Sequence, residues 1–317
     1  MGRNRLHLLF AVMCLIWGTT WIAMKAGIAA VPPVFFAGTR FVAAGVALLA
    51  ILRLRGEPVG VARVDLARFT AVTALMVAFT YALLFWGMRF VDSGLAAILD
   101  LSLIPVALLV IGIALGEERF SWSRAAAILL GIGGILILFG PKAISAMRGD
   151  AAELWGGIAI AASAIVYSCG SVLARPLLRT YAPMLVSGVT ALGGGLALTF
   201  GALLLEPGAV AALKGDWGIA AWIGWTFLVL FGSVAAYTIY LRLLRDWGAS
   251  RAGAYAFVSP TIAVLLGILV LGEEVHPTDA FGMAIMLAAA WLALREEPSS
   301  IGRAEPLAIL AAKPHRS

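Results

Sequence analysis

Charged residues are scarce in this sequence. Asp, Glu, Lys and Arg make up 13% of its 317 residues, about half the fraction found in a soluble globular domain. Hydrophobic residues make up 62%, and the mean hydropathy is +1.00. This composition excludes a cytosolic protein. Because a spanning helix needs about 20 apolar residues, the chain has room for on the order of ten membrane spans.

Cysteine, histidine and enzyme motifs are also scarce. Cys14 and Cys169 lie inside apolar segments without a partner at metal or redox spacing. No phosphate-binding loop motif occurs, and the glycines from Gly131 to Gly134 lie inside an apolar helix, where small residues let helices approach closely. We therefore interpret these glycines as packing residues. We expect no enzyme, catalytic residue, metal, cofactor or nucleic acid partner.

Apolar runs of spanning length, interrupted by Pro, Gly and charge, predict ten helices. They lie near 6–25, 33–53, 66–88, 91–115, 123–142, 154–174, 183–205, 217–241, 248–271 and 278–295. The sequence from 296 to 317 mixes Glu, Pro, Ser, Lys and Arg around a short apolar stretch. We predict that this tail is disordered and cytoplasmic.

Lys and Arg gather on alternate loops. Most of them lie at the N-terminus, in 53–68, 116–124, 175–182 and 242–251, and in the tail. Positively charged flanks are retained on the cytoplasmic side. We therefore expect a multi-pass inner-membrane protein with both termini in the cytoplasm.

The two halves of the chain resemble each other. Residues 81, 89 and 115–118 (Tyr, Arg and Leu-Gly-Glu-Glu) recur in the same order at 237, 245 and 271–274. Each copy, 6–142 and 154–295, would contain five helices, and an odd number places the second copy upside down in the membrane. The expected fold is therefore all-α, with ten transmembrane helices as two inverted five-helix repeats around a central cavity. This architecture is typical of secondary transporters.

Several short motifs occur in a set order along the chain. They are the run from Leu15 to Trp21, Arg40-Phe41, the run from Ser93 to Ala97, Pro105 with Gly116-Glu117, and the run from Tyr255 to Pro260 with Gly272-Glu273. This set resembles the EamA family of the drug/metabolite transporter superfamily over about residues 8–295. The resemblance implies a ten-helix bundle with a central cavity that moves amino acids, other metabolites or drugs, often outward.

Asp100 departs from the usual pattern of that family, which has an apolar residue near this point. It lies about 13 Å along its predicted helix, near the middle of a hydrocarbon core about 30 Å thick. A carboxyl group there costs free energy unless it faces a wet cavity, finds a cation or stays protonated. Asp100 is thus a candidate for proton coupling or for binding a substrate ammonium. The alternative is a structural partner for Arg40 or a neutral acid bonded to Ser102.

Arg40, Lys25 and two prolines are further candidates. Arg40 would hold a substrate carboxylate bidentately or act structurally, and Lys25 would contact substrate or extend to the headgroups. Pro105 and Pro260 interrupt helices at matching places in the two copies, which is a pointer to a transporter's site. Either proline would otherwise be an ordinary kink that shapes the cavity.

Aromatic and hydroxyl side chains in five of the predicted helices complete the expected cavity lining. They are Trp17, Thr20, Trp21, Thr80, Tyr81, Tyr167, Ser168, Ser233, Tyr237, Tyr255 and Ser259.

The sequence thus predicts a secondary transporter of amino acids, related amphipathic solutes or drugs, working by alternating access between its halves. We expect an exporter coupled to protons through Asp100, with the lipid bilayer and a small solute as partners. A passive exchanger or importer is the alternative within this class. From another class, a membrane-embedded enzyme or accessory subunit handling lipid-linked intermediates is the alternative. The oligomeric state is left open.

Overall fold

The structure, a computed structural model, describes residues 3–91, 93–147, 149–271 and 276–295. Throughout these residues the secondary structure is helical, without strands. Nine helical stretches in this part of the chain are long and apolar enough to cross a membrane, and one further apolar helix, Ile98–Ala114, is shorter. The predicted all-α fold of a multi-pass membrane protein is confirmed.

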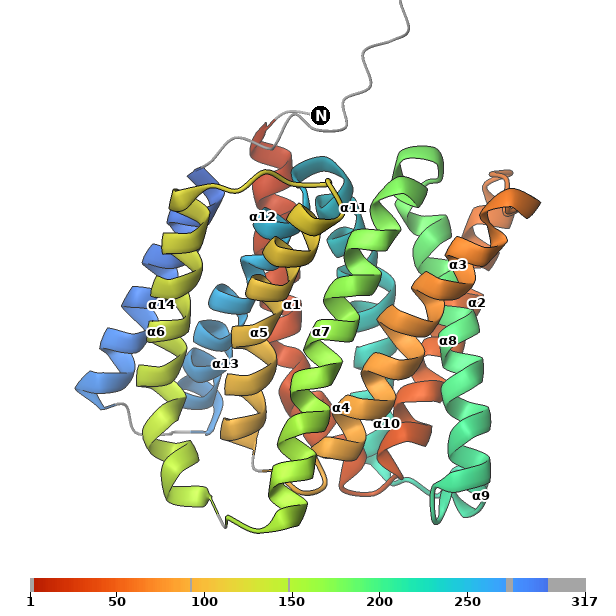
Figure 1. The fold of residues 1–317 in the computed structure, drawn as a ribbon. Helices are drawn as coiled ribbons and strands as arrows, with labels where there is room; N and C mark the ends of the chain where they lie inside the picture. Colours follow the sequence, from red (N-terminus) through yellow and green to blue (C-terminus); the bar gives the residue numbers. More distant parts are fainter. Residues whose placement is uncertain (1–2, 92, 148, 272–275, 296–317) are drawn as a thin grey trace, which may run out of the picture.

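In the described residues these nine spans and the helix that contains Ile98–Ala114 follow one another along the chain, as Figure 1 allows the reader to trace. Seven are single helices: α1 (Arg3–Ile28), α2 (Pro33–Leu54), α5 (Ser93–Ala114), α6 (Trp122–Ala146), α7 (Ala151–Thr180), α8 (Pro183–Leu205) and α14 (Pro277–Arg295). The others are composite: α3 (Leu66–Thr73), η2 (Ala74–Phe79) and α4 (Thr80–Gly87); α10 (Ile219–Phe227), η3 (Leu228–Ala236) and α11 (Tyr237–Trp247); α12 (Ala249–Gly253) and α13 (Tyr255–Leu271). Two short helices in loops, η1 (Arg63–Asp65) and α9 (Ala209–Ala212), were not predicted.

Corresponding helices of the two halves pack on each other. The most extensive contacts in the bundle join α2 to α8 and α6 to α14. Figure 1 shows α2 with α8 at one edge of the bundle and α6 with α14 at the other. Between these pairs lie α1, α5, α7 and α13, so the middle of the bundle is built from both halves of the chain.

Two spans contain π-helical segments, η2 and η3, in their middle portions. They occupy equivalent places in the third and eighth spans, just before Tyr81 and Tyr237. A π-helical turn is wider than an α-turn and is frequent at functional sites. The Thr80 hydroxyl donates to the carbonyl of Leu75, 2.6 Å away, and so satisfies an acceptor within the irregular segment.

Two helix ends predicted from charge are wrong. The sequence assigned 175–182 to a turn and ended the eighth span near 241, but α7 continues to Thr180 and α11 to Trp247. The basic residues that suggested these ends are paired within the fold: Arg175 and Arg179 bind Glu117, and Arg245 binds Asp246. The left-handed backbone of Gly248, with φ +89°, then ends α11.

Glu206 joins the end of α8 to the beginning of α2. Its carboxylate accepts hydrogen bonds from the backbone N–H groups of Val34, at 3.1 Å, and Phe35, at 2.8 Å. These N–H groups have no partner within their own helix, and the helix dipole favours a negative charge at this place.

We expect Glu206→Ala to lower the free energy of unfolding by about 1–2 kcal/mol, because two backbone donors lose a charged acceptor. Thermal unfolding in detergent would measure this change. Glu57→Ala is the control, since Glu57 is exposed on a loop. Equal unfolding midpoints for the two variants would contradict the capping role.

Candidate functional site

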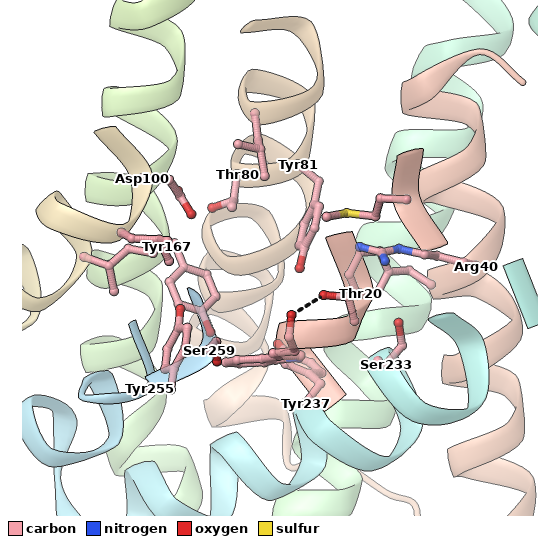
Figure 2. A pocket seen from close by; sticks show the side chains of 17 residues that line it. Thr20, Arg40, Thr80, Tyr81, Asp100, Tyr167, Ser233, Tyr237, Tyr255 and Ser259 are labelled. Atoms are coloured by element: carbon pink, nitrogen blue, oxygen red, sulfur yellow. Dashed lines mark hydrogen bonds between the residues drawn. The ribbon is translucent and has the colours of Figure 1, made fainter. Parts of the chain in front are cut away.

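A cavity lies in the middle of the bundle (Figure 2). Its walls come from α1, α2, α4 and α5 of the first half of the chain and from α7, η3, α11 and α13 of the second half. Its volume is about 120 Å³, several times the space of about 10–15 Å³ that one water requires by the same kind of measure. The cavity is therefore large enough for a small solute.

Arg40 contributes a buried positive charge to one wall. The residue is only 4% exposed. Its guanidinium carbon lies 4.7 Å from the ring centre of Phe41 and 5.1 Å from that of Tyr81, and both distances allow cation–π attraction. The Nε of Arg40 is buried without a hydrogen-bond partner, and its guanidinium forms no ion pair with any described residue.

Asp100 of α5 lies at the opposite side of the cavity from Arg40 (Figure 2). No ion pair or hydrogen bond joins its carboxyl group to another of the described residues. The structure therefore does not contain the Asp100–Arg40 pair that the sequence left open. It places two opposite charges apart, facing a shared space.

Hydroxyl groups also line the cavity. Thr20 donates to the carbonyl of Trp17 at 2.7 Å, which leaves its oxygen free to accept. The Tyr237 hydroxyl lies 3.1 Å from the Thr190 hydroxyl, and either of them is able to donate. The Ser259 hydroxyl is buried without a partner. The cavity thus offers neutral polar groups in addition to its charges.

An aromatic layer bounds the cavity toward the end of the bundle where α1 begins. The Trp17 ring lies 4.5 Å from that of Tyr255 and 5.4 Å from that of Tyr240. Tyr240 also contacts Tyr167, at 5.6 Å between ring centres, and is fully buried. The rings of Trp17, Tyr167 and Tyr255 line the cavity. Tyr240 lies about one turn beyond the lining residue Tyr237 in α11. These rings therefore pack together on the side of the cavity that faces this end.

A charged cluster lies beyond the aromatic layer, at the same end of the bundle. Glu118, 4% exposed, accepts from the backbone N–H of Ser250 at 2.9 Å and from the Ser250 hydroxyl. Its carboxylate also pairs with Arg124 at 3.4 Å. These contacts tie the turn after α5 to α6 and α12.

Glu117, the neighbour of Glu118, reaches α7. Its carboxylate pairs with Arg175 at 3.1 Å and with Arg179 at 2.5 Å. The Arg175 guanidinium also donates to the Glu117 carbonyl. The Gly-Glu-Glu turn of the first half is therefore a junction of four helical elements. The equivalent residues Glu273 and Glu274 lie outside the described residues.

The cavity brings together most of the residues singled out from sequence. These are Trp17, Thr20, Arg40, Thr80, Tyr81, Asp100, Tyr167, Ser233, Tyr237, Tyr255 and Ser259. Their binding roles stay predictions. Trp21 and Lys25 lie on α1, but their side chains are outside the part of the chain that the structure describes.

Three predicted residues lie away from the lining. Pro105 and Pro260 are inside α5 and α13, each close to a lining residue, Ile104 or Ser259. Ser168 is buried against α5, where its hydroxyl donates to the carbonyls of Ala164, at 2.8 Å, and Ile104, at 3.4 Å. Ser168 therefore joins two helices, because its own face of α7 is turned toward α5.

Six lining residues were missed by the sequence analysis: Met24, Phe41, Leu84, Leu101, Ile104 and Gly232. All are apolar and lie in spans where nearly every residue is apolar. No polar signal separates such residues from those that face lipid. Phe41, next to Arg40 in the family motif, is the one whose place the sequence could have indicated.

The residues that the structure describes lack the clustered ligands of a metal site. They contain no group of three or more His, Cys, Asp or Glu side chains that could hold a metal ion. The polar groups of the cavity are instead suited to noncovalent binding of a small charged or polar molecule.

A helical bundle of membrane-spanning length around a small, partly charged cavity defines a multi-pass membrane protein of the transporter class. The chain belongs to the EamA-like transporter family, which it matches over residues 4–140 and again over 154–295. The resemblance inferred from the motifs is thereby confirmed.

Relatives with transporter names cover nearly the whole chain. The inner membrane transporter YedA of Escherichia coli (strain K12) is 29% identical over 282 residues, which is 88% of this chain and 87% of YedA. The transporter YoaV of Bacillus subtilis (strain 168) is 24% identical, covering 82% of this chain and 87% of YoaV. The names of these relatives indicate a membrane transporter.

A solved structure, described only as "Crystal structure of protein", has the same fold. It superposes with a TM-score of 0.77 at 20% sequence identity, over 92% of this chain and 97% of that chain. At this identity the match concerns the fold alone.

Proposed function

We propose that this protein is a secondary transporter of the inner membrane that exports small metabolites, such as amino acids and related amphipathic solutes, by alternating access. The observation that carries the proposal is the central cavity, which is lined by helices of both halves and holds two opposite charges that form no ion pair with any other described residue. Charged side chains within a membrane bundle are expensive and typically mark a substrate or ion pathway.

We propose that the two halves are inverted repeats that rock against each other. In Figure 1, α2 and α8 run in opposite directions, as do α1 and α7, which are the corresponding helices of the two copies. The two π-helical segments also occupy equivalent places beside the cavity. A two-fold relation of this kind would expose one site to either side in turn.

In this proposal the end of the bundle where α1 begins, which also holds the charged cluster, is cytoplasmic. The aromatic layer and the pairs of Glu117 and Glu118 close the cavity toward that end. The structure would then correspond to a state closed on the inside. Export requires these contacts to separate so that solute reaches the cavity from the cytoplasm.

Asp100 is the proposed site of proton coupling. Its carboxyl group lies in the cavity, and the titratable or charged groups that face the same space are Arg40 from α2, Tyr81 from α4, Tyr167 from α7, Tyr237 from α11 and Tyr255 from α13. Among them Asp100 is the one carboxyl group. In this proposal the Asp100 carboxyl group binds a proton in one part of the transport cycle and releases it in another, when the carboxylate must be charged.

Purified protein in liposomes with an internal pH dye would test transport and coupling together. The vesicles are made acidic inside, and amino acids, amines and aromatic acids are added outside. Exchange of solute for protons raises the internal pH, so we expect a solute-dependent alkalinisation. Asp100→Asn should abolish it, while Glu57→Gln, which removes an exposed carboxylate, should leave it unchanged.

Each result decides between the proposal and its alternatives. Solute movement without proton flux would support the passive exchanger or importer and overturn coupling. Undiminished proton flux with Asp100→Asn would overturn the role of Asp100 alone. If no solute crosses, the transporter proposal itself is wrong, and the lipid-linked enzyme or accessory subunit becomes the better interpretation.

A further inference from the structure

The charges of the cavity are arranged in a way that neither the family match nor the names of the relatives assign. Arg40 and Asp100 face the same space from different helices, α2 and α5, at opposite sides of it (Figure 2). They are the charged members among the described lining residues. Each would gain from a partner of opposite charge, yet they do not bind each other.

Arg40 is built to hold an anion. Its planar guanidinium lies against the rings of Phe41 and Tyr81, which restricts its rotation before a ligand binds. It is 96% buried, as its exposed fraction of 4% implies, and its Nε donor is unused. A guanidinium in this state matches a carboxylate, which accepts two parallel hydrogen bonds from its fork.

Asp100 offers the complementary group. In its ionised form the carboxylate is an acceptor only, and an ammonium is the donor that supplies both hydrogen bonds and a compensating charge. An ammonium also has π-rings available nearby, because Trp17, Tyr81 and Tyr255 line the same cavity. The carboxylate of a ligand would be repelled from this side.

The wall also contains a group of apolar side chains. They are Met24, Phe41, Leu84, Leu101 and Ile104, and the cavity has a volume of about 120 Å³. A ligand that satisfies both charges must therefore be short enough to present its two ionic groups within one small space, and the apolar residues favour a hydrocarbon side chain on it. Opposite charges on one ligand also keep the net charge of the occupied cavity unchanged.

We propose that the cavity is a bipolar site that selects compact zwitterions, with Arg40 binding the carboxylate and Asp100 the ammonium of the same molecule. This rests on the proposed transport function and adds a substrate class and its orientation. The proton and the ammonium exclude each other at Asp100, since a protonated carboxyl lacks the charge that holds the ammonium.

The test is binding by the purified full-length protein of a matched ligand series on one hydrocarbon frame. Leucine carries both charges, isopentylamine only the ammonium, and isocaproate only the carboxylate. Wild-type protein should bind leucine about tenfold to 100-fold more tightly than either analogue, the effect of one charge-assisted contact. Isothermal calorimetry in detergent would measure all three affinities, with phenylalanine and methionine as further zwitterions.

Two variants should respond in opposite ways. Asp100→Asn should weaken the binding of leucine and isopentylamine and leave the affinity for isocaproate within about twofold of wild type. Arg40→Gln should weaken the binding of leucine and isocaproate and leave the affinity for isopentylamine unchanged. Each loss should have the size expected for one charge-assisted contact. Arg40→Lys keeps the charge without the fork and should fall between wild type and Arg40→Gln. Glu57→Gln is the control with unchanged binding.

A loss of all three ligands in one variant, with an unchanged thermal midpoint, would overturn the assignment of that residue. Equal wild-type affinities for the zwitterion and an analogue, or no binding of any zwitterion, would overturn the bipolar site. Neither result depends on flux in liposomes. Transport without this selectivity refutes the inference alone, and selectivity without transport refutes the proposed function alone.

Discussion

Glu118→Ala should lower the free energy of unfolding by about 3 kcal/mol or more, since removal of one partner from a buried ion pair is strongly destabilising. Glu118 is buried, and its carboxylate binds Arg124 as well as the backbone and side chain of Ser250. The variant would remove the charged acceptor that Arg124 and Ser250 share. The turn after α5 would lose its connection to α6 and α12.

Thermal unfolding followed by size-exclusion chromatography in detergent would measure this effect. Asp246→Ala is the matched control, because Asp246 also pairs with arginine near the same end of the bundle but its partners Arg242 and Arg245 are about one-third exposed. Exposed pairs contribute about 0–1 kcal/mol. Similar midpoints for the two variants would show that the Glu118 cluster is not a structural junction.

The Glu118 variant should also transport more slowly in the liposome assay. In the proposed cycle, the cluster stabilises the state that is closed at the cytoplasmic end, and its loss shifts the population away from that state. Glu118→Gln retains an acceptor for Ser250 and should lie between wild type and Glu118→Ala in both assays. A destabilised variant with full transport rate would separate the structural role from the proposed gating role.

Gly134→Val should have an effect of similar size for a different reason. A Cβ atom on Gly134 would lie 2.5 Å from the Met286 side chain, 2.9 Å from the Gly282 carbonyl and 3.0 Å from the Met286 backbone nitrogen. Two of these contacts are with backbone, which cannot rotate away. Overpacking of this kind costs about 1–3 kcal/mol and occasionally more, and it would separate α6 from α14.

Gly133→Val is the control on the neighbouring residue. No atom lies within 4 Å of the Cβ that would be added there, and both changes replace glycine by the same residue within α6. We expect wild-type stability or a slight gain for Gly133→Val and a clearly lower unfolding midpoint for Gly134→Val. Equal midpoints would contradict the close packing of α6 on α14.

The glycine cluster also shows where sequence reasoning reaches its limit. All of its glycines were interpreted as packing residues. This is correct for Gly131, whose added Cβ would meet the Phe257 ring, and for Gly134. It is wrong for Gly133, which has open space beside it. A glycine has no side chain to reveal its direction, and in a uniformly apolar helix the neighbours do not reveal it either.

The residues that line the cavity also divide into those that the sequence could indicate and those that it could not. Polar and aromatic residues such as Thr20, Tyr81 and Ser233 could be predicted because polar groups within a membrane span need a partner or a wet surface. Ser168 is also a polar residue within a span, yet its hydroxyl donates to the backbone carbonyls of Ala164 and Ile104 and does not face the cavity. Apolar lining residues such as Leu101 gave no signal, since lipid and cavity walls use the same side chains.

By itself, the sequence determined the class of protein, the number of spans and the approximate helix ranges, because the thickness of the bilayer imposes length and apolarity on each span. The order of its motifs determined the family. Tertiary structure alone decided that Arg40 and Asp100 face one cavity without pairing, and that Glu117 and Glu118 gather four helical elements. Such relations depend on how helices are rotated and packed against one another, which hydropathy and charge along a single span do not specify.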